Sequence, residues 1–276
     1  MATSQDDDIK FGFPASGISA AAGRHKYRDR YEALAEIFHR YNSHHLPTTT
    51  QKRQLPREYV HKVIMDEKLP VVSVRTQHNK DAEKDIKETL TKKVEECILK
   101  INNGQISQQA TKDAIMYSER ILDMNRGTYL EDETIEKINK TGHYKVEKVN
   151  TCFRKKFGYK NRHTVFGRVD GVVKDGKTIK AVVEIKNRKD RFFMPVYDLD
   201  QLASYVFMTG AQEGIFVQQL EGELNITVYD REDLMERWAM IEADLKKTIK
   251  FARKIVKYPE GPEWKQLKEM FIFSDD

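Results

Sequence analysis

The chain has 276 residues, of which 39% are hydrophobic and 10% aromatic, so it can bury the core of one large domain or two small ones. Charged residues make up 33%, the net charge is +5, and no apolar run reaches the eighteen or so residues of a membrane span. Cys97 and Cys152 have no CxxC partners, which argues against a disulfide framework or zinc site and favours a reducing, intracellular compartment, cytoplasmic or nuclear. We expect the acidic residues 1–9 to form a disordered tail rather than a secretory signal.

The first half of the chain has the hydrophobic spacing of helices. Residues 17–42 predict a helix, a glycine break and a second helix, and residues 43–56 predict a loop. Further helices are expected at 56–68, 81–101, 107–123 and 128–140, with an extended segment at 69–74. Thr128, which follows Gly127, is the expected N-cap of the last of these helices.

The pattern then changes to the alternation of strands. Strands are expected at 144–153, 162–173 and 178–186, as in an antiparallel meander, and again at 214–219 and 224–229. Helices are expected at 196–209, ending at Gly210, and at 231–257. This order predicts one α/β domain over residues 10–276, with a mixed central β-sheet flanked by helices and a helical N-terminal half.

Positive charge is concentrated in one part of the chain. Residues 141–195 contain 15 Lys or Arg against 5 Asp or Glu. Such an excess suits a polyanion such as nucleic acid, although a solvated, lysine-rich surface would have the same composition.

Carboxylates stand out within this basic region, in the segment VFGRVDGVVKDGKTIKAVVEIKNR at 165–188. A hairpin would bring Asp170 close to Glu184 and Lys186, which share one face of a strand because side chains alternate. Converging carboxylates repel each other unless a cation lies between them, and oxygen ligands select Mg²⁺, with Mn²⁺ as the alternative. The carbonyl of Ile185 is a candidate further ligand, and Lys186 would orient the attacking water. The competing interpretation is a surface Glu–Lys pair, since EIK is a common string.

The D…ExK spacing resembles the signature of the PD-(D/E)xK nuclease superfamily, with Val169 in place of the usual proline. Three further segments are similar to its lambda-exonuclease and YqaJ-like branch, which includes viral and phage alkaline exonucleases. NRGTYLEDETIEKI matches a helix in which Glu131 would supply another metal carboxylate, unless it is an ordinary acidic helix start. DLDQLASYVFMTGAQEGIFVQQ matches a Q-x-x-x-Y helix through Gln201 and Tyr205, the latter equally suited to core packing. FPASGISAAAGRHKYRDRYEAL resembles the branch's N-terminal segment.

The resemblance covers roughly residues 9–40 and 120–230 and implies a restriction-endonuclease-like fold. Residues 120–230 would be the catalytic core, 231–257 a closing helix, and 43–118 a possible helical insertion. It implies Mg²⁺-dependent 5′-to-3′ digestion of duplex DNA in recombination, repair or viral genome processing. A single-strand-annealing protein and a trimer of this chain are implied partners. The implied catalytic residues are Glu131, Asp170, Glu184, Lys186 and Gln201, and all but the last two would bind metal together with Ile185.

The resemblance also implies a 5′-phosphate pocket formed by Lys10, Ser16 and Arg168. Arg168 replaces a small hydroxyl residue, so the pocket must differ, and an endonuclease, an RNase or a non-catalytic nucleic-acid-binding module stays an alternative. Candidate phosphate contacts are Arg24, His25, Lys26, Tyr27 and Arg30, although these residues could equally form a basic helix surface.

Overall fold

The computed structural model describes residues 9–42, 44, 54–68, 80–100, 106–258 and 261–271. Its contacts divide the chain into two compact units: residues 1–33 with 130–257, called unit 1, and residues 34–129 with 258–276, called unit 2. Most of the predicted tail lies outside the described residues, and Ile9, its last residue, is buried. The prediction of a single domain with an insertion stays a prediction.

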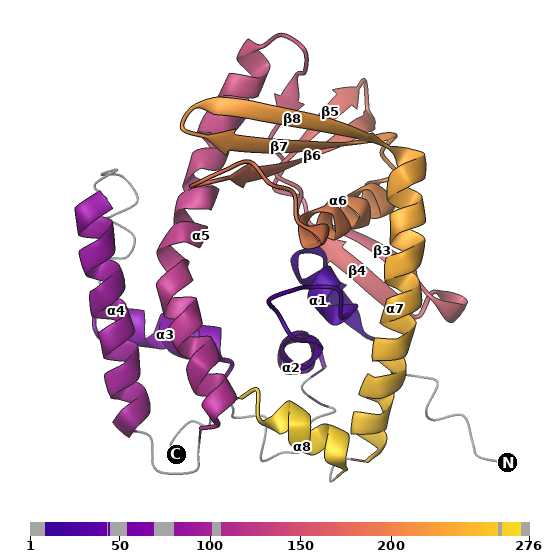
Figure 1. Cartoon of the computed structure of the whole chain (residues 1–276). Helices are drawn as coiled ribbons and strands as arrows, with labels where there is room; N and C mark the ends of the chain where they lie inside the picture. The colour runs from indigo at the N-terminus through magenta and orange to yellow at the C-terminus, as the bar shows by residue number, and fades with distance from the viewer. Residues whose placement is uncertain are drawn as a thin grey trace, which may run out of the picture. The chain divides into compact units, whose positions relative to one another are not determined.

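Unit 1 contains two mixed β-sheets (Figure 1). The larger has the order β2-β5-β6-β7-β8, formed by Val146–Glu147, Gly171–Asp175, Thr178–Asn187, Glu213–Leu220 and Glu223–Asp230. In it β6 and β7 are parallel, and the other neighbours are antiparallel. The smaller has the order β1-β4-β3, formed by Gly12–Pro14, His163–Gly167 and Phe153–Phe157. The predicted α/β class with a mixed sheet is confirmed.

Helices cover the larger sheet. The last turns of α5 (Gln108–Lys140) contribute Ile135 and Ile138 to a core shared with Val183 and Ile185 of β6. Helix α6 (Val196–Thr209) also packs on β6 and β7, and α7 (Arg231–Lys257) packs on α6 (Figure 1). Because side chains alternate along β6, its even-numbered residues face away from the core that α5 shares.

Helices α6 and α7 were predicted closely. Helix α6 ends at Gly210, whose φ of 78° suits glycine and whose N–H donates to the carbonyl of Val206 at 2.9 Å. Helix α7 buries residues that recur at helical spacing, including Leu234, Trp238, Ile241, Leu245 and Ile249.

The predicted meander is wrong, because the strand expected at 162–173 belongs to two sheets. Strand β4 ends at Gly167 in the smaller sheet, and β5 begins at Gly171 in the larger. Glycine permits close packing at both points: a Cβ would lie 3.0 Å from Ala15 at Gly167 and 2.5 Å from Val146 at Gly171. The strand expected at 144–153 is likewise divided into β2 and β3. Asp170 therefore lies in the link between the two sheets.

The helices expected at 107–123 and 128–140 are one helix, α5. Inside it the hydroxyl of Thr128 donates to the carbonyl of Met124, so Thr128 is not an N-cap. Gly127 does not stop the helix, since one glycine costs only about 1 kcal/mol in a helix interior.

The N-terminal segment has short elements. A single 3₁₀ turn, Ala15–Gly17, precedes α1 (Ile18–Ala21), and Gly23, with a φ of 72°, begins a turn before α2 (Arg30–Tyr41). The break between the two predicted helices is thus longer than one glycine, and β1 was not predicted.

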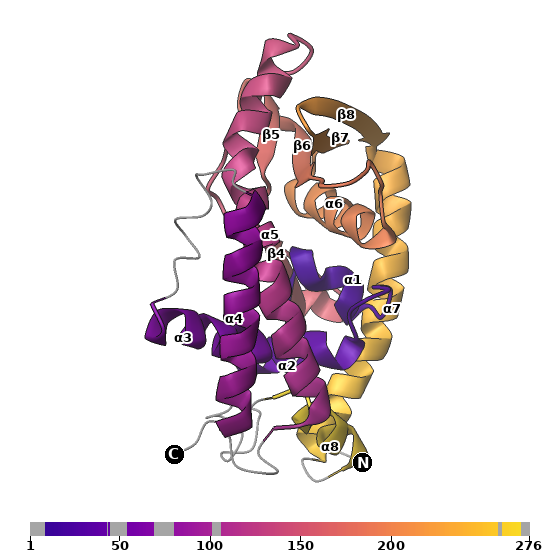
Figure 2. The same ribbon diagram turned by 60° about the vertical axis from the view of Figure 1, so that its left-hand side comes forward.

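Unit 2 is helical in its described parts. It contains most of α2, then α3 (Pro56–Asp66), α4 (Lys80–Lys100), the first part of α5, and α8 (Pro262–Lys268), which was not predicted. Figure 2 shows α4 beside α5, where the hydroxyls of Thr91 and Ser118 are 3.1 Å apart. Its core consists of Val60, Val63, Leu90, Val94, Ile98, Ala110, Ala114, Ile121 and Leu122.

Two expectations concern single features. No helix in the described ranges is both long enough and apolar enough to cross a membrane. Cys97 and Cys152 are both free, the first half-buried and the second exposed. The segment 69–74 and most of 43–56 lie outside the described residues.

Candidate active site

The candidate site lies in unit 1, where the link between the two sheets meets β6. The backbone N–H of Ile185 donates to Oδ2 of Asp170 at 2.7 Å, so this carboxylate extends the hydrogen bonding of β6 beyond its ladder with β5. The N–H and C=O of a strand residue point to the same side, so the carbonyl of Ile185 is directed toward the side of Asp170. The structure thus brings these two predicted residues together.

Glu184 is the most deeply buried acid of the site, with 1% of its surface exposed. Its Oε1 forms an ion pair with Nζ of Lys186, as the shared strand face predicted. Its Oε2 is buried without a hydrogen-bond partner among the described residues. Burial, and then the negative charge of Asp170, raise the pKa of Glu184 to about 8.

Lys186 stays charged in these surroundings. Besides Glu184, its Nζ lies 3.8 Å from Oδ1 of Asp198 and 3.4 Å from Oε1 of Gln201. Burial acts to lower the pKa of Lys186, but the carboxylates of Glu184 and Asp198 outweigh burial, and the pKa is raised. Lys186 is therefore a fixed cation at neutral pH.

Glu131, on α5, belongs to the same electrostatic group. It is half-buried, and burial followed by repulsion from Asp170 raises its pKa to about 7. Burial also raises the pKa of Asp170, against the hydrogen bond from Ile185. Acids with raised pKa values that repel one another are a frequent feature of functional sites.

These residues have the chemistry of a hard-cation site. Carboxylate and carbonyl oxygens are the ligands that Mg²⁺ and Mn²⁺ prefer, and Oε2 of Glu184 is an oxygen that a cation would satisfy. In the described ranges, however, no three His, Cys, Asp or Glu side chains are grouped closely enough to hold a metal ion. The donor types fit Mg²⁺, while binding by Glu131, Asp170, Glu184 and Ile185 together stays a prediction.

Gln201 and Tyr205 support Lys186 from α6. The side-chain oxygen of Gln201 faces Lys186, and its Nε2 donates to the hydroxyl of Tyr205 at 2.8 Å. Tyr205 is only 3% exposed, and burial raises its pKa well above the usual value. The structure therefore places Tyr205 beneath Gln201 as packing and support, the alternative that the sequence left open.

Two residues of the site were missed by sequence reasoning. Asp198, 3% exposed, accepts a hydrogen bond from Nη2 of Arg188 at 2.6 Å and lies close to Lys186. The available signal was an acidic pair, D-L-D, immediately before Gln201. That pair gave no indication that the first acid would face β6.

The residues of the predicted 5′-phosphate pocket are not all brought together. Strands β1 and β4 are parallel and pair Pro14 with Phe166, so Ser16 and Arg168 follow at the same edge. Both are exposed. Lys10, also exposed, precedes β1, so it lies at the opposite end of that strand from Ser16.

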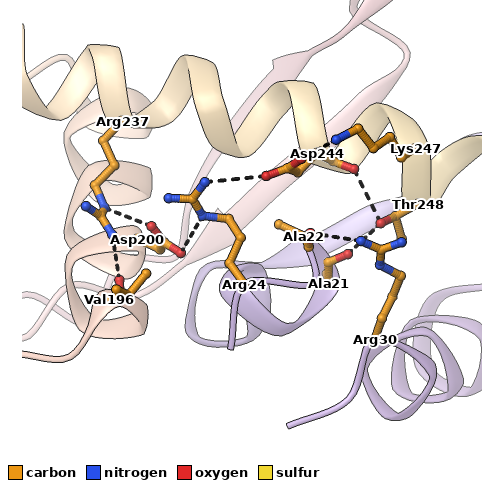
Figure 3. Close-up of polar contacts among 10 residues, drawn as sticks. All are labelled: Ala21, Ala22, Arg24, Arg30, Val196, Asp200, Arg237, Asp244, Lys247 and Thr248. Carbon is orange, nitrogen blue, oxygen red and sulfur yellow. Dashed lines mark hydrogen bonds and ion pairs between the residues drawn. The ribbon is translucent and has the colours of Figure 1, made fainter. Parts of the chain in front are cut away.

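The predicted DNA-contacting residues of the N-terminal segment have different surroundings. Arg24 is 3.1 Å from Asp200 and 3.4 Å from Asp244, and Arg30 donates to the carbonyl of Ala22 (Figure 3). Lys26 and Tyr27 are exposed. Arg24 is thus tied to helices α6 and α7, and its contact with phosphate stays a prediction.

Comparison with known proteins gives similar structures but no family model and no curated protein that matches. An alkaline exonuclease from Laribacter hongkongensis is 20% identical, with 59% of this chain and 90% of that chain covered and a TM-score of 0.39. A phage-related exonuclease from Haemophilus somnus 129PT is 10% identical, with 93% and 100% covered and a TM-score of 0.40. SSO0001 is 16% identical, with 64% and 87% covered and a TM-score of 0.33. The similar structures include alkaline and phage-related exonucleases, the class that the sequence resemblance named, and at these identities the likeness concerns the fold alone.

Proposed function

We propose that this chain is a metal-dependent nuclease that hydrolyses phosphodiester bonds of duplex DNA, acting as a 5′-to-3′ exonuclease. The observation that carries the proposal is the buried Glu184, ion-paired with Lys186 and repelled by Asp170. A carboxylate that needed only a structural partner would not be placed beside a second acid in a buried site.

The residues of the chain have separate roles in this mechanism. Mg²⁺, or Mn²⁺ in its place, would be held by Glu131, Asp170, Glu184 and the carbonyl of Ile185, and would supply Lewis-acid activation of water and of the phosphate. Lys186 is permanently charged, so it holds the attacking water by hydrogen bonding or neutralises charge that develops on the phosphate oxygens.

Two side chains fix the direction of this cation. Gln201 and Asp198 both lie within 4 Å of Nζ of Lys186, and each is itself held by another residue of the unit. A lysine restrained in this way loses little conformational entropy when substrate binds.

The nature of the substrate follows from charge. The basic excess over residues 141–195 attracts a polyanion, and Ser16 and Arg168 at one edge of the smaller sheet could bind a terminal phosphate. Recombination, repair or viral genome processing, with an annealing protein as partner and a trimeric assembly, is the role that fits such an activity.

Digestion of linear duplex DNA, 5′-phosphorylated and end-labelled, tests the proposal beside a covalently closed circle. We expect mononucleotides from the linear DNA in Mg²⁺, none in EDTA, and an intact circle. Nicking of the circle would indicate an endonuclease, which the large exposed Arg168 would favour. Cleavage of RNA would indicate an RNase, and binding without any cleavage a non-catalytic module.

Two substitutions locate the site. Asp170→Ala and Lys186→Ala should each reduce cleavage at least 1,000-fold, by roughly 4 kcal/mol of transition-state stabilisation, while the circular dichroism spectrum stays unchanged. Lys174→Ala is the matched control, because Lys174 forms a 2.8 Å pair with Glu147 that is exposed on the same sheet. Wild-type cleavage by either site variant would place the chemistry elsewhere.

A further inference from the structure

Three aromatic rings of unit 1 form a group at the surface beside α6. The ring of His25 is stacked on that of Tyr197, with centroids 4.2 Å apart and an angle of 17° between the planes. Tyr27 meets His25 edge-on at 6.5 Å, and 59% of Tyr27 is exposed. This arrangement is held in place, because the backbone N–H of Tyr27 donates to Nδ1 of His25 at 3.1 Å.

The group lies one helical turn from the candidate active site. Tyr197 and Gln201 are four residues apart on α6, so their side chains are neighbours on the same face of the helix. Gln201 contacts Lys186, and Asp198, the residue after Tyr197, contacts Lys186 and Arg188. A strand that is cut at Lys186 would therefore pass close to the aromatic group.

The attachment of the group to α6 is firm. Arg24 immediately precedes His25, and its guanidinium pairs with Asp200, whose side chain is fully buried (Figure 3). The same carboxylate pairs with Arg237 of α7 at 2.8 Å. Rings that are held by such a clamp lose little freedom when they receive a ligand.

Positive charge borders the rings. Nζ of Lys26 lies 5.2 Å from the centroid of Tyr27, and Arg188 stacks on Phe193, which is 43% exposed, at 4.2 Å. Exposed aromatic faces next to cations are the components with which proteins bind single-stranded nucleic acid.

We propose that His25, Tyr27 and Tyr197 form a stacking platform for an unpaired base of the strand that the active site cuts. The inference rests on the proposed nuclease function and refines it, since the substrate at the site would be a single-stranded or frayed end. In a paired duplex the base faces are covered by their neighbours, so a ring platform would gain contact only with an unstacked base. Tyr27 is the residue with most to contribute, because it exposes most of its ring.

Binding without metal tests the platform separately from catalysis. Fluorescence anisotropy of a labelled single-stranded oligonucleotide in EDTA would give Kd for the wild type and each variant. Tyr27→Ala should raise Kd about 5- to 100-fold, the range for loss of one stacked base, and Tyr27→Phe should change it less than twofold. An oligonucleotide of abasic residues should bind wild type and Tyr27→Ala equally.

The chain offers a matched control at Tyr159. This tyrosine is 72% exposed and has Nζ of Lys160 at 5.3 Å from its ring, so it reproduces the Tyr27–Lys26 pair away from α6. Tyr159→Ala should leave Kd unchanged. An equal loss in both tyrosine variants, or none in Tyr27→Ala, would overturn the platform even if wild type cleaves DNA. Tyr27-dependent binding by a protein that cleaves nothing in Mg²⁺ would keep the platform and remove the nuclease function.

Discussion

At the scale of single residues, the most informative group is Glu184. Its pKa of about 8 reflects burial and a neighbouring acid, so the metal-free site holds this carboxyl largely protonated at neutral pH. Glu131, with a pKa of about 7, is in a similar state. Both must lose their protons before they can bind a cation as carboxylates.

Binding of Mg²⁺ should therefore depend on pH. Since the raised pKa values favour the protonated acids, the affinity should increase as pH rises from 6 to about 8 and then level off. Isothermal titration calorimetry at pH 6, 7, 8 and 9 would measure this, and proton release should appear in buffers of different ionisation enthalpy. Glu184→Gln, which cannot ionise, should bind Mg²⁺ weakly at every pH, and a profile as steep as that of the wild type would contradict the assignment.

How far the sequence predicts this site depends on whether a contact is local. Glu184 and Lys186 were predicted to share a face because strand alternation operates within three residues. The involvement of Asp198 could not be predicted in this way, because it depends on where α6 packs across β6. Lys10 was aligned by sequence distance to Ser16, and the intervening β1 separates them.

At the scale of elements, one carboxylate joins three segments. Asp200 on α6 receives Arg24 from the N-terminal segment and Arg237 from α7, and Thr248 of α7 donates to the carbonyl of Ala21 at 2.7 Å (Figure 3). Asp200 is fully buried, whereas the two arginines are 16% and 22% exposed.

Removal of this carboxylate should be costly. Asp200→Ala leaves two largely buried cations without their shared partner, and it should destabilise the protein by about 3–5 kcal/mol. Urea denaturation followed by circular dichroism would measure the change. Lys247→Ala, which breaks the exposed pair with Asp244, is the control and should cost less than about 1 kcal/mol. Equal costs for the two variants would show that the Asp200 network is not a major anchor.

The same scale shows where sequence patterns fail for elements. The alternation over 162–173 is continuous, yet the chain passes between sheets at Arg168 to Asp170, because the glycines at 167 and 171 permit close contacts that alternation does not encode. Conversely, Gly127 suggested a break that the hydrogen-bond ladder of α5 overrides. Periodicity predicts the type of an element better than its partners or its ends.

At the scale of the whole molecule, composition and element order predicted the α/β class, which the two mixed sheets confirm. The division into two compact units was not predicted. Each helix of unit 2 has an amphipathic pattern, but such a pattern shows only that a helix buries one face and does not identify the core to which it belongs.

The stability of the whole fold should depend on one histidine in acid. His163 of β4 is 5% exposed, lies between the rings of Phe11 and Phe157 at 5.8 Å, and accepts a hydrogen bond at Nδ1 from the N–H of Phe11. Burial, and then the charges of Arg253 and Arg162, lower its pKa from 6.5 to about 4. Protonation would place an uncompensated charge among these rings and remove the acceptor that joins β1 to β4.

The sign of the effect follows from linkage. Between pH 6.5 and about 4 the unfolded chain binds a proton at this position that the folded chain does not, so the free energy of unfolding falls with pH. The loss attributable to His163 should be on the order of 2–3 kcal/mol over this window. Glu131 and Glu184 act in the opposite direction above pH 4.5, so urea denaturation must compare the wild type with His163→Gln at each pH. The variant should lose this acid slope, and the exposed His143→Gln should retain it. Parallel pH profiles for the wild type and His163→Gln would show that protonation of His163 does not limit the stability of the fold.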